Sequence, residues 1–440
     1  MQTNSEGLTH KRILGVAIPI VLANATIPIL GAVDTAVVGQ LGLAVPIGAV
    51  GIGAIIITAI YWLFGFLRMG TTGLTAQALG SGDKSETSAL LVRGILIGLV
   101  AGLVLIVAQV PLFFGALQLS PASLEVEDLA QKYLQIRVYS APAAIALFGI
   151  TGWLIAKEKT RAVLLLQLAL NGINIILDLV FVLKLGWGVE GVAIATLIAE
   201  WSGLIFGLWL AREGFNNGYW KNWVQIFNRV RLVQMAKVNG DIMVRSIMLE
   251  IGFVSFLFLG ASFDDATLAA NQILIQFLSI AVHALDGFAF AAETLVGQAL
   301  GAKNRPLFRR AVVMTSQWGL GSVALMALVF FVFGNSIINI MTTAEDVRAV
   351  SNEYLPWIVL APLAGVAAWM LDGIFIGATR TADMRNMMFI SFCVYLIALV
   401  LLLPSYGNHG LWASLIIFSI ARGVTLGFKY PALEASVELK

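Results

Sequence analysis

The chain has 440 residues, of which 59% are hydrophobic and only 12% are charged, and its formal net charge is +2 at pH 7. A soluble domain has about 25% charged and about 45–50% apolar residues, so this composition excludes a water-soluble protein. It predicts an integral membrane protein, and the single cysteine, Cys393, excludes an internal disulfide.

Long apolar segments recur from one end of the chain to the other. Each is continuously apolar over the roughly 20 residues needed to cross about 30 Å of hydrocarbon, which is typical of helices and not of β-barrel strands. The first segment is too long for a cleaved signal peptide, so we expect it to be retained. Basic and acidic loops alternate, which predicts that both termini are cytoplasmic. Twelve spans are predicted, at residues 13–39, 47–69, 89–115, 128–155, 161–184, 189–211, 233–260, 267–292, 309–334, 346–376, 386–403 and 409–428.

The two halves of the sequence repeat. The sequence Gln-Ala-Leu-Gly occupies residues 77–80 and again residues 298–301, a shift of 221. Six predicted helices separate equivalent points, an even number, so the halves have the same orientation, which is typical of transporters that hold a substrate between two bundles. We predict an all-α polytopic membrane protein with twelve transmembrane helices in two parallel, pseudo-symmetric six-helix bundles. The bundles are residues 1–211 and 233–440, joined by a cytoplasmic linker at 212–232.

An aspartate, Asp34, lies within the first predicted span. An ionisable group at membrane depth costs a few kcal/mol or more and usually marks an ion or substrate path. Pro19 and Pro28 each remove a backbone hydrogen bond from the same helix, so both are candidate hinges. The alternative interpretation is a protonated Asp34 that only bonds to a neighbouring helix.

Further polar residues share faces of the fifth and sixth predicted spans. The fifth span has four polar residues at i, i+4, i+7 and i+11, which lie on one helical face. The sixth span has two polar residues four positions apart, one helical turn from each other. They are Gln167, Asn171, Asn174 and Asp178, then Thr196 and Glu200. Asp34, Asn174, Asp178 and Thr196 together offer only oxygen donors, which suit H⁺ or a hard cation such as Na⁺. We expect no cofactor and no other metal, and a cluster that merely locks helices together is the alternative.

The second half carries its own acids in predicted spans. Glu250, Asp286 and Asp372 are candidates for a second ion or a cationic substrate, with helix-helix bonding as the alternative. Asp241 and Arg245 lie four residues apart on one helix, a spacing that predicts an ion pair between them.

Three stretches of the sequence resemble the DinF branch of the multidrug and toxic compound extrusion (MATE) family. They are FLRMGTTGLTAQ at 66–77, ALDGFAFAAE at 284–293 and LDGIFIGATR at 371–380. The resemblance covers essentially the whole chain. It implies export of organic cations and other amphipathic compounds in exchange for H⁺ or Na⁺.

The same resemblance implies roles for individual residues. Asp34 matches the first-helix aspartate that takes the proton, and Asn174, Asp178 and Thr196 match the rest of the cation site in type and spacing. Pro19 matches the proline linked to bending of the first helix.

The NorM branch of the family instead places a Na⁺ site in its second half. Glu250 and Asp372 resemble the acids of that site, so the sequence leaves the choice between H⁺ and Na⁺ open.

We therefore expect a monomeric antiporter of the inner (plasma) membrane. Its expected partners are the lipid bilayer and small organic molecules, with no nucleic acid. A flippase for a lipid-linked saccharide is the alternative, although the acidic cavity candidates disfavour it. A receptor or channel would need no internal repeat, and an enzyme would need a nucleophile or a metal cluster, which the sequence does not offer.

Overall fold

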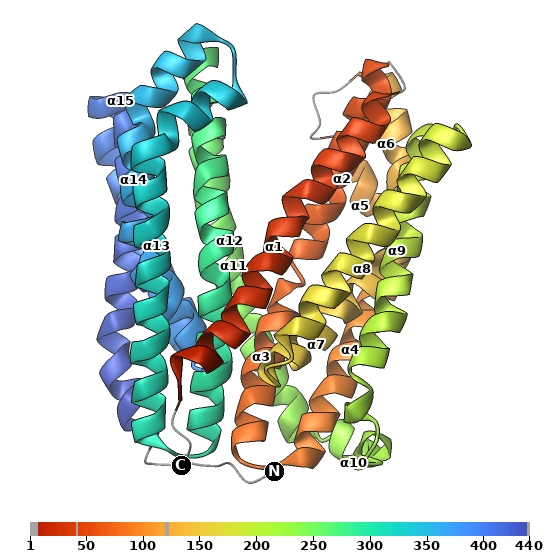
Figure 1. The fold of residues 1–440 in the computed structure, drawn as a ribbon, viewed down its shortest axis with the longest axis vertical. Helices are drawn as coiled ribbons and strands as arrows, with labels where there is room; N and C mark the ends of the chain where they lie inside the picture. Colours follow the sequence, from red (N-terminus) through yellow and green to blue (C-terminus); the bar gives the residue numbers. More distant parts are fainter. Residues whose placement is uncertain (1–7, 41–42, 119–122, 438–440) are drawn as a thin grey trace. The chain divides into compact units, whose positions relative to one another are not determined.

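The computed structural model describes residues 8–40, 43–118 and 123–437, and nearly all of these residues are helical (Figure 1). The α-helices are α1 (His10–Gly39), α2 (Ala44–Trp62), α3 (Gly65–Gly80), α4 (Lys84–Val107), α5 (Gln109–Leu117), α6 (Leu124–Arg137), α7 (Ala141–Ala156), α8 (Thr160–Asp178), α9 (Gly188–Leu210), α10 (Trp223–Ile226), α11 (Arg229–Gly260), α12 (Asp265–Gly301), α13 (Arg305–Met341), α14 (Glu345–Gly377) and α15 (Thr381–Ala435). Short helical turns are η1 (Val138–Ser140), η2 (Leu179–Lys184), η3 (Arg212–Gly214) and η4 (Tyr219–Lys221).

Eleven segments in the described part of the chain are long and apolar enough to cross a membrane. The last of them, α15, has 55 residues, or about 80 Å at about 1.5 Å per residue, which is more than twice the hydrocarbon thickness. It is two helices, because Gly407 interrupts it with φ 55° and ψ −131°, a conformation that favours glycine. Helix α15 therefore supplies two spans, and the predicted total of twelve is confirmed.

The chain folds as two compact units, each described by itself. The N-terminal unit comprises Leu22–Thr75 and Asp83–Val233. The C-terminal unit comprises the described residues up to Val21, then Ala76–Gly82 and the described residues from Gln234 onward. The boundary inside α1 falls between Val21 and Leu22, and so between Pro19 and Pro28.

In the N-terminal unit, α4 and α7 cross through glycines. Gly94 and Gly149 face each other, and Gly98 faces the backbone of Ala146. A β-carbon at Gly149 would lie 2.8 Å from the backbone carbon of Gly94, closer than real side chains approach. The two helices therefore pack backbone to backbone, and neither can rotate against the other without a clash.

Two ionic contacts hold the residues that follow α9. Glu213, in η3, is paired with the ammonium groups of Lys157 and Lys159, the latter at 2.5 Å. Partial burial pushes the pKa of Glu213 upward, but the contacts with the two lysines outweigh it and hold that pKa below its ordinary value.

Arg93 of α4 makes the second contact. Its guanidinium pairs with Glu86 at 2.6 Å and donates to the backbone oxygens of Gln225 and Ile226 at 2.6 and 2.7 Å. The Gln225 side chain also donates to Glu86, at 2.7 Å. This buried network satisfies the last carbonyl groups of α10 and ties the linker to α4.

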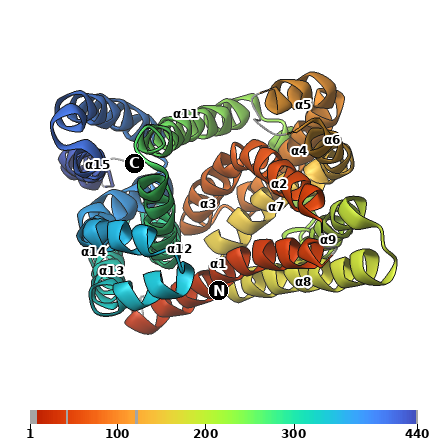
Figure 2. The same ribbon diagram turned by 90° about the horizontal axis from the view of Figure 1, so that it is seen from above.

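In the C-terminal unit, α12, α13 and α14 lie side by side (Figure 2). Two asparagines fix the break in α15 to this layer. Asn271 of α12 donates to Asn408 Oδ1 at 2.7 Å, and Asn408 donates back to Asn271 Oδ1 at 3.0 Å. Trp412 Nε1 donates to the same oxygen of Asn271 at 2.9 Å. All three side chains are buried, so the break is held by a fully paired polar cluster.

The repeated Gln-Ala-Leu-Gly sequence forms a reciprocal contact, also within the C-terminal unit. Gly80, at the end of α3, lies against the backbone of Gln298 in α12, and Gly301 lies against the backbone of Gln77. A β-carbon at either glycine would overlap a carbonyl oxygen. Residues 77–80 and 298–301 are equivalent in the repeat, so each half of the sequence supplies one glycine and one glutamine backbone to the contact. This exchange is what a pseudo-two-fold axis requires.

Candidate functional site

Three helices of the N-terminal unit bring the four predicted cation-coupling residues together. Asp34 comes from α1, Asn174 and Asp178 from one face of α8, and Thr196 from α9, which lies beside α8 (Figure 2). We assign the Asn174 amide so that its nitrogen donates to Asp34 Oδ1 and to Asp178 Oδ2, each at 3.2 Å. Its oxygen then accepts from the backbone nitrogen of Thr196 at 3.2 Å. One amide therefore bridges two carboxyl groups.

The local fold around Asp178 is unusual. Asp178 is the last residue of α8, and the chain widens into π-helical geometry over Leu179–Lys184 immediately after it. Wide turns of this kind are frequent at functional sites. Asn174 and Asp178 have no solvent-exposed surface, so the turn fixes a charged group inside the protein.

The carboxyl groups of Asp34 and Asp178 share one donor, because the Asn174 amide nitrogen lies 3.2 Å from an oxygen of each. Two neighbouring carboxylates repel each other, so this arrangement is favourable when the pair holds one proton or binds a cation. Asp178 Oδ1 is buried and has no hydrogen-bond partner among the described residues. A fully buried carboxylate oxygen without a partner is costly unless the group is protonated or binds a cation.

The orientation of Asn174 bears on which cation fits. Its NH₂ group, a donor, faces both acids, while its oxygen faces Thr196. Na⁺ requires oxygen ligands, so Asn174 would have to turn its amide over to contribute to a Na⁺ site between the acids. With this assignment the amide satisfies both acids without a bound cation, and with the opposite one its oxygen would face a cation held between them.

The other two polar residues of the α8 face make contacts between helices. Gln167 Nε2 donates to Asn171 Oδ1 at 3.0 Å, and Asn171 Nδ2 donates to Thr26 Oγ1 of α1 at 2.9 Å. Gln167 and Asn171 therefore attach α8 to α1, and the structure keeps them apart from the carboxyl pair.

An arginine that the sequence reasoning missed lies near the carboxyl pair. Arg137, the last residue of α6, forms two bonds to Glu200 of α9, at 3.0 and 3.2 Å, and a third to Ser140 Oγ at 2.8 Å. Its positive charge also acts on Asp34 and Asp178. Glu200, a predicted ion or substrate candidate, is thus engaged by a buried guanidinium in a two-bond geometry. The sequence feature that could have revealed Arg137 is its position, because it is a basic residue inside the predicted span at 128–155.

The acids of the C-terminal unit are arranged differently. Asp372 is buried against two guanidinium groups, those of Arg245 and of Arg422, the latter at 2.6 Å. Asp241 pairs with Arg385 at 2.6 Å. The predicted ion pair between Asp241 and Arg245 is therefore wrong, since each residue has a partner on another helix. With two positive charges beside it, Asp372 has no excess negative charge to offer a cation.

The remaining two candidate acids do not join these pairs. Glu250 is exposed on α11, and Asp286 is partly buried on α12. Within the described ranges, no cluster of three or more His, Cys, Asp or Glu side chains is arranged to hold a metal ion.

Twelve spans in two repeated halves, with buried acids on spanning helices, define a multi-pass membrane transporter. The chain belongs to the MATE family of multidrug and toxin efflux transporters, because the MatE family model matches residues 19–180 and again residues 242–402. The match of one model to both halves agrees with the internal repeat, and the expected family is confirmed.

The chain is similar to relatives over nearly its whole length. It is 37% identical over 423 residues to DNA damage-inducible protein F of Escherichia coli (strain K12), covering 95% of this chain and 91% of the relative. It is 26% identical over 450 residues to a protein of Bacillus anthracis described as a probable multidrug resistance protein, NorM, covering 96% and 95%.

Solved structures share the fold. The bent form of the Vibrio cholerae MATE transporter VcmN superposes with a TM-score of 0.85 at 24% identity, covering 98% of both chains. A structure described as MATE in the straight conformation superposes with a TM-score of 0.84 at 18% identity, covering 98% of this chain and 97% of that one. One described as MATE in the bent conformation superposes with a TM-score of 0.85 at 17% identity, covering 97% and 96%.

Proposed function

We propose that this chain is a proton-coupled antiporter that exports amphipathic, cationic organic compounds across the inner (plasma) membrane. The observation that carries the proposal is the Asn174 amide that bridges the carboxyl groups of Asp34 on α1 and Asp178 on α8. A pair of carboxyl groups that holds one proton can gain or lose it when the site opens to one side of the membrane, which is the elementary step of proton coupling.

Charge links the proton to the substrate. With the pair fully deprotonated, Asp34, Asp178 and Glu200 carry three negative charges against the single positive charge of Arg137, a net −2. An organic cation is attracted to that state and is released when a proton replaces it. Competition between proton and substrate for one negative site is sufficient for antiport.

Helix α1 supplies the moving part in this proposal. Its residues divide between the two compact units at Val21 and Leu22, between two prolines that weaken the helix. Protonation of Asp34 removes a charge from the half that carries it, and α1 then bends and closes the space used by the substrate. Deprotonation on the inner side resets the cycle.

The membrane potential adds to the driving force. One charge that crosses 100 mV releases about 2.3 kcal/mol, enough for roughly fiftyfold accumulation per ion. In this proposal the protein acts as a monomer with both termini in the cytoplasm, uses no cofactor and performs no chemical conversion.

The test is efflux of a fluorescent organic cation from proteoliposomes that contain the full chain. A pH gradient alone is expected to drive efflux, and a Na⁺ gradient alone is not. Asp34→Asn is expected to abolish gradient-driven efflux, while Asp346→Asn, an exposed aspartate at the start of α14, retains it. Efflux driven by Na⁺ alone would replace the proton with Na⁺ as coupling ion. Unchanged efflux by Asp34→Asn would remove this residue from the mechanism.

A further inference from the structure

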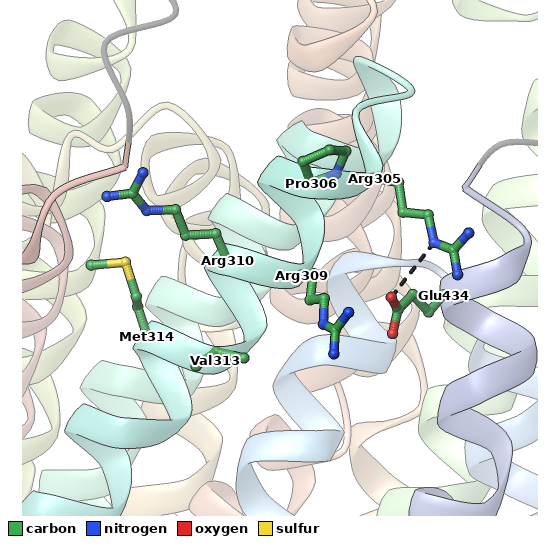
Figure 3. Close-up of a pocket in the computed structure, with 7 residues that line it drawn as sticks. All are labelled: Arg305, Pro306, Arg309, Arg310, Val313, Met314 and Glu434. Atoms are coloured by element: carbon green, nitrogen blue, oxygen red, sulfur yellow. Dashed lines mark ion pairs between the residues drawn. The ribbon is translucent and has the colours of Figure 1, made fainter.

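A cavity of about 600 Å³ lies beside the first turns of α13, wholly inside the C-terminal unit (Figure 3). It belongs to none of the clusters described above. Its lining residues are Arg305, Pro306, Arg309, Arg310, Val313, Met314 and Glu434.

The cavity is strongly basic. The lining contains three arginines and one glutamate, a net charge of +2. Arg310 projects to the opposite side of α13 from Glu434 (Figure 3). Arg305 lies 3.5 Å from Glu434, and Figure 3 shows Arg305 and Arg309 directed toward the helix that carries this acid. In the described part of the chain, neither Arg309 nor Arg310 forms an ion pair.

The lining changes from basic to apolar along α13. Arg305, Arg309 and Val313 follow one another at intervals of four residues, and Arg310 and Met314 form a parallel row, so each row ends in an apolar side chain. The six residues from Arg305 to Arg310 span about 7.5 Å of helix axis, at about 1.5 Å for each of five steps. That length matches the roughly 5–8 Å headgroup layer at each face of a bilayer. Val313, which is 46% exposed, then lies where acyl chains begin.

We propose that this cavity binds the phosphate headgroup of an anionic phospholipid from the adjoining leaflet. Guanidinium groups bind phosphate oxygens in pairs, with strong charge-assisted hydrogen bonds. A freely dissolved phosphate would satisfy the arginines but leave the apolar end of both rows without a partner. A lipid satisfies both ends, because its acyl chain continues over Val313 and Met314.

The test is native mass spectrometry of the full chain with phosphatidylglycerol and with phosphatidylethanolamine of identical acyl chains. Phosphatidylglycerol is expected to bind more tightly, and Arg309→Gln/Arg310→Gln is expected to weaken it about 25-fold, at about fivefold per arginine. The matched control is Arg161→Gln/Arg229→Gln, which removes two exposed arginines at the starts of α8 and α11 and should leave the tightest site unchanged.

A variant that binds the lipid more tightly separates the proposal from misfolding, because a misfolded protein would lose binding. Glu434→Gln removes the only acid among the described lining residues and is expected to tighten phosphatidylglycerol binding about fivefold. Equal weakening by both double variants, or no gain from Glu434→Gln, would overturn the proposal. Displacement of the lipid by millimolar inorganic phosphate would assign the cavity to a free anion instead.

Discussion

Replacement of Arg137 by methionine tests the buried ion pair beside the candidate proton site. The variant leaves Glu200, whose side chain is 13% exposed, without its positive partner. At about 4 Å between charge centres and an effective dielectric constant of about 20, the lost attraction is about 4 kcal/mol. Removal of one partner of a buried pair commonly costs about 3–5 kcal/mol. We therefore expect the free energy of unfolding to fall by about this amount.

A double-mutant cycle separates this pairing from simple loss of packing. Glu200→Gln alone should also destabilise the protein, because it leaves Arg137 charged and buried. The double variant, with both charges removed, should lose about 2 kcal/mol or less, and not the sum of the two single losses. The measurement is unfolding by SDS titration in mixed micelles, with Arg229→Met, an exposed arginine, as the control. Strict additivity of the two single losses would show that the pair contributes no coupling and refute the reasoning.

Three further outcomes are expected. Gly80→Ala and Gly301→Ala should each lower the free energy of unfolding by about 1–3 kcal/mol. The double variant should lose less than the sum of the two, because either substitution already forces the same two backbones apart. Full additivity in the same SDS titration would contradict this. Asn271→Leu should lower the free energy of unfolding by about 1–3 kcal/mol, because it leaves Asn408 buried and unpaired. The double variant Asn271→Leu/Asn408→Leu should recover part of that loss. A double variant no more stable than Asn271→Leu would argue against the pairing. The lowered pKa of Glu213 stabilises the fold above its unfolded pKa of about 4.3, and this stabilisation is lost as pH falls through the folded value. Glu213→Gln should therefore lower Tm at pH 7 but not at pH 3, and an equal change at both values would exclude a role for its charge.

The positions of the spans could be predicted from the sequence because lipid imposes one rule. Every backbone polar group must be bonded inside its own helix, so a long apolar segment has one available structure. The break at Gly407 lies between the predicted spans at 386–403 and 409–428, where the sequence turns polar. Asp34, Asn174 and Asp178 could likewise be grouped, since spacing places the last two on one face and the family resemblance adds the first.

Partners across helices could not be predicted in this way. Asp241 and Arg245 have the spacing of an ion pair, yet each meets a residue on another helix, and one-dimensional spacing carries no information on such neighbours. Arg137 lies inside the predicted span at 128–155, where the basic residues that mark loops are not expected. An arginine inside a predicted span indicates a buried acid elsewhere, and Glu200 was that acid.

The reciprocal contact of residues 77–80 with residues 298–301 has a consequence for the origin of the fold. One tetrapeptide provides both surfaces, which is the property of an isologous interface in a two-fold homodimer. A single six-helix protein would already possess everything this contact requires, so two separate copies could pair through it before any gene fusion joined them.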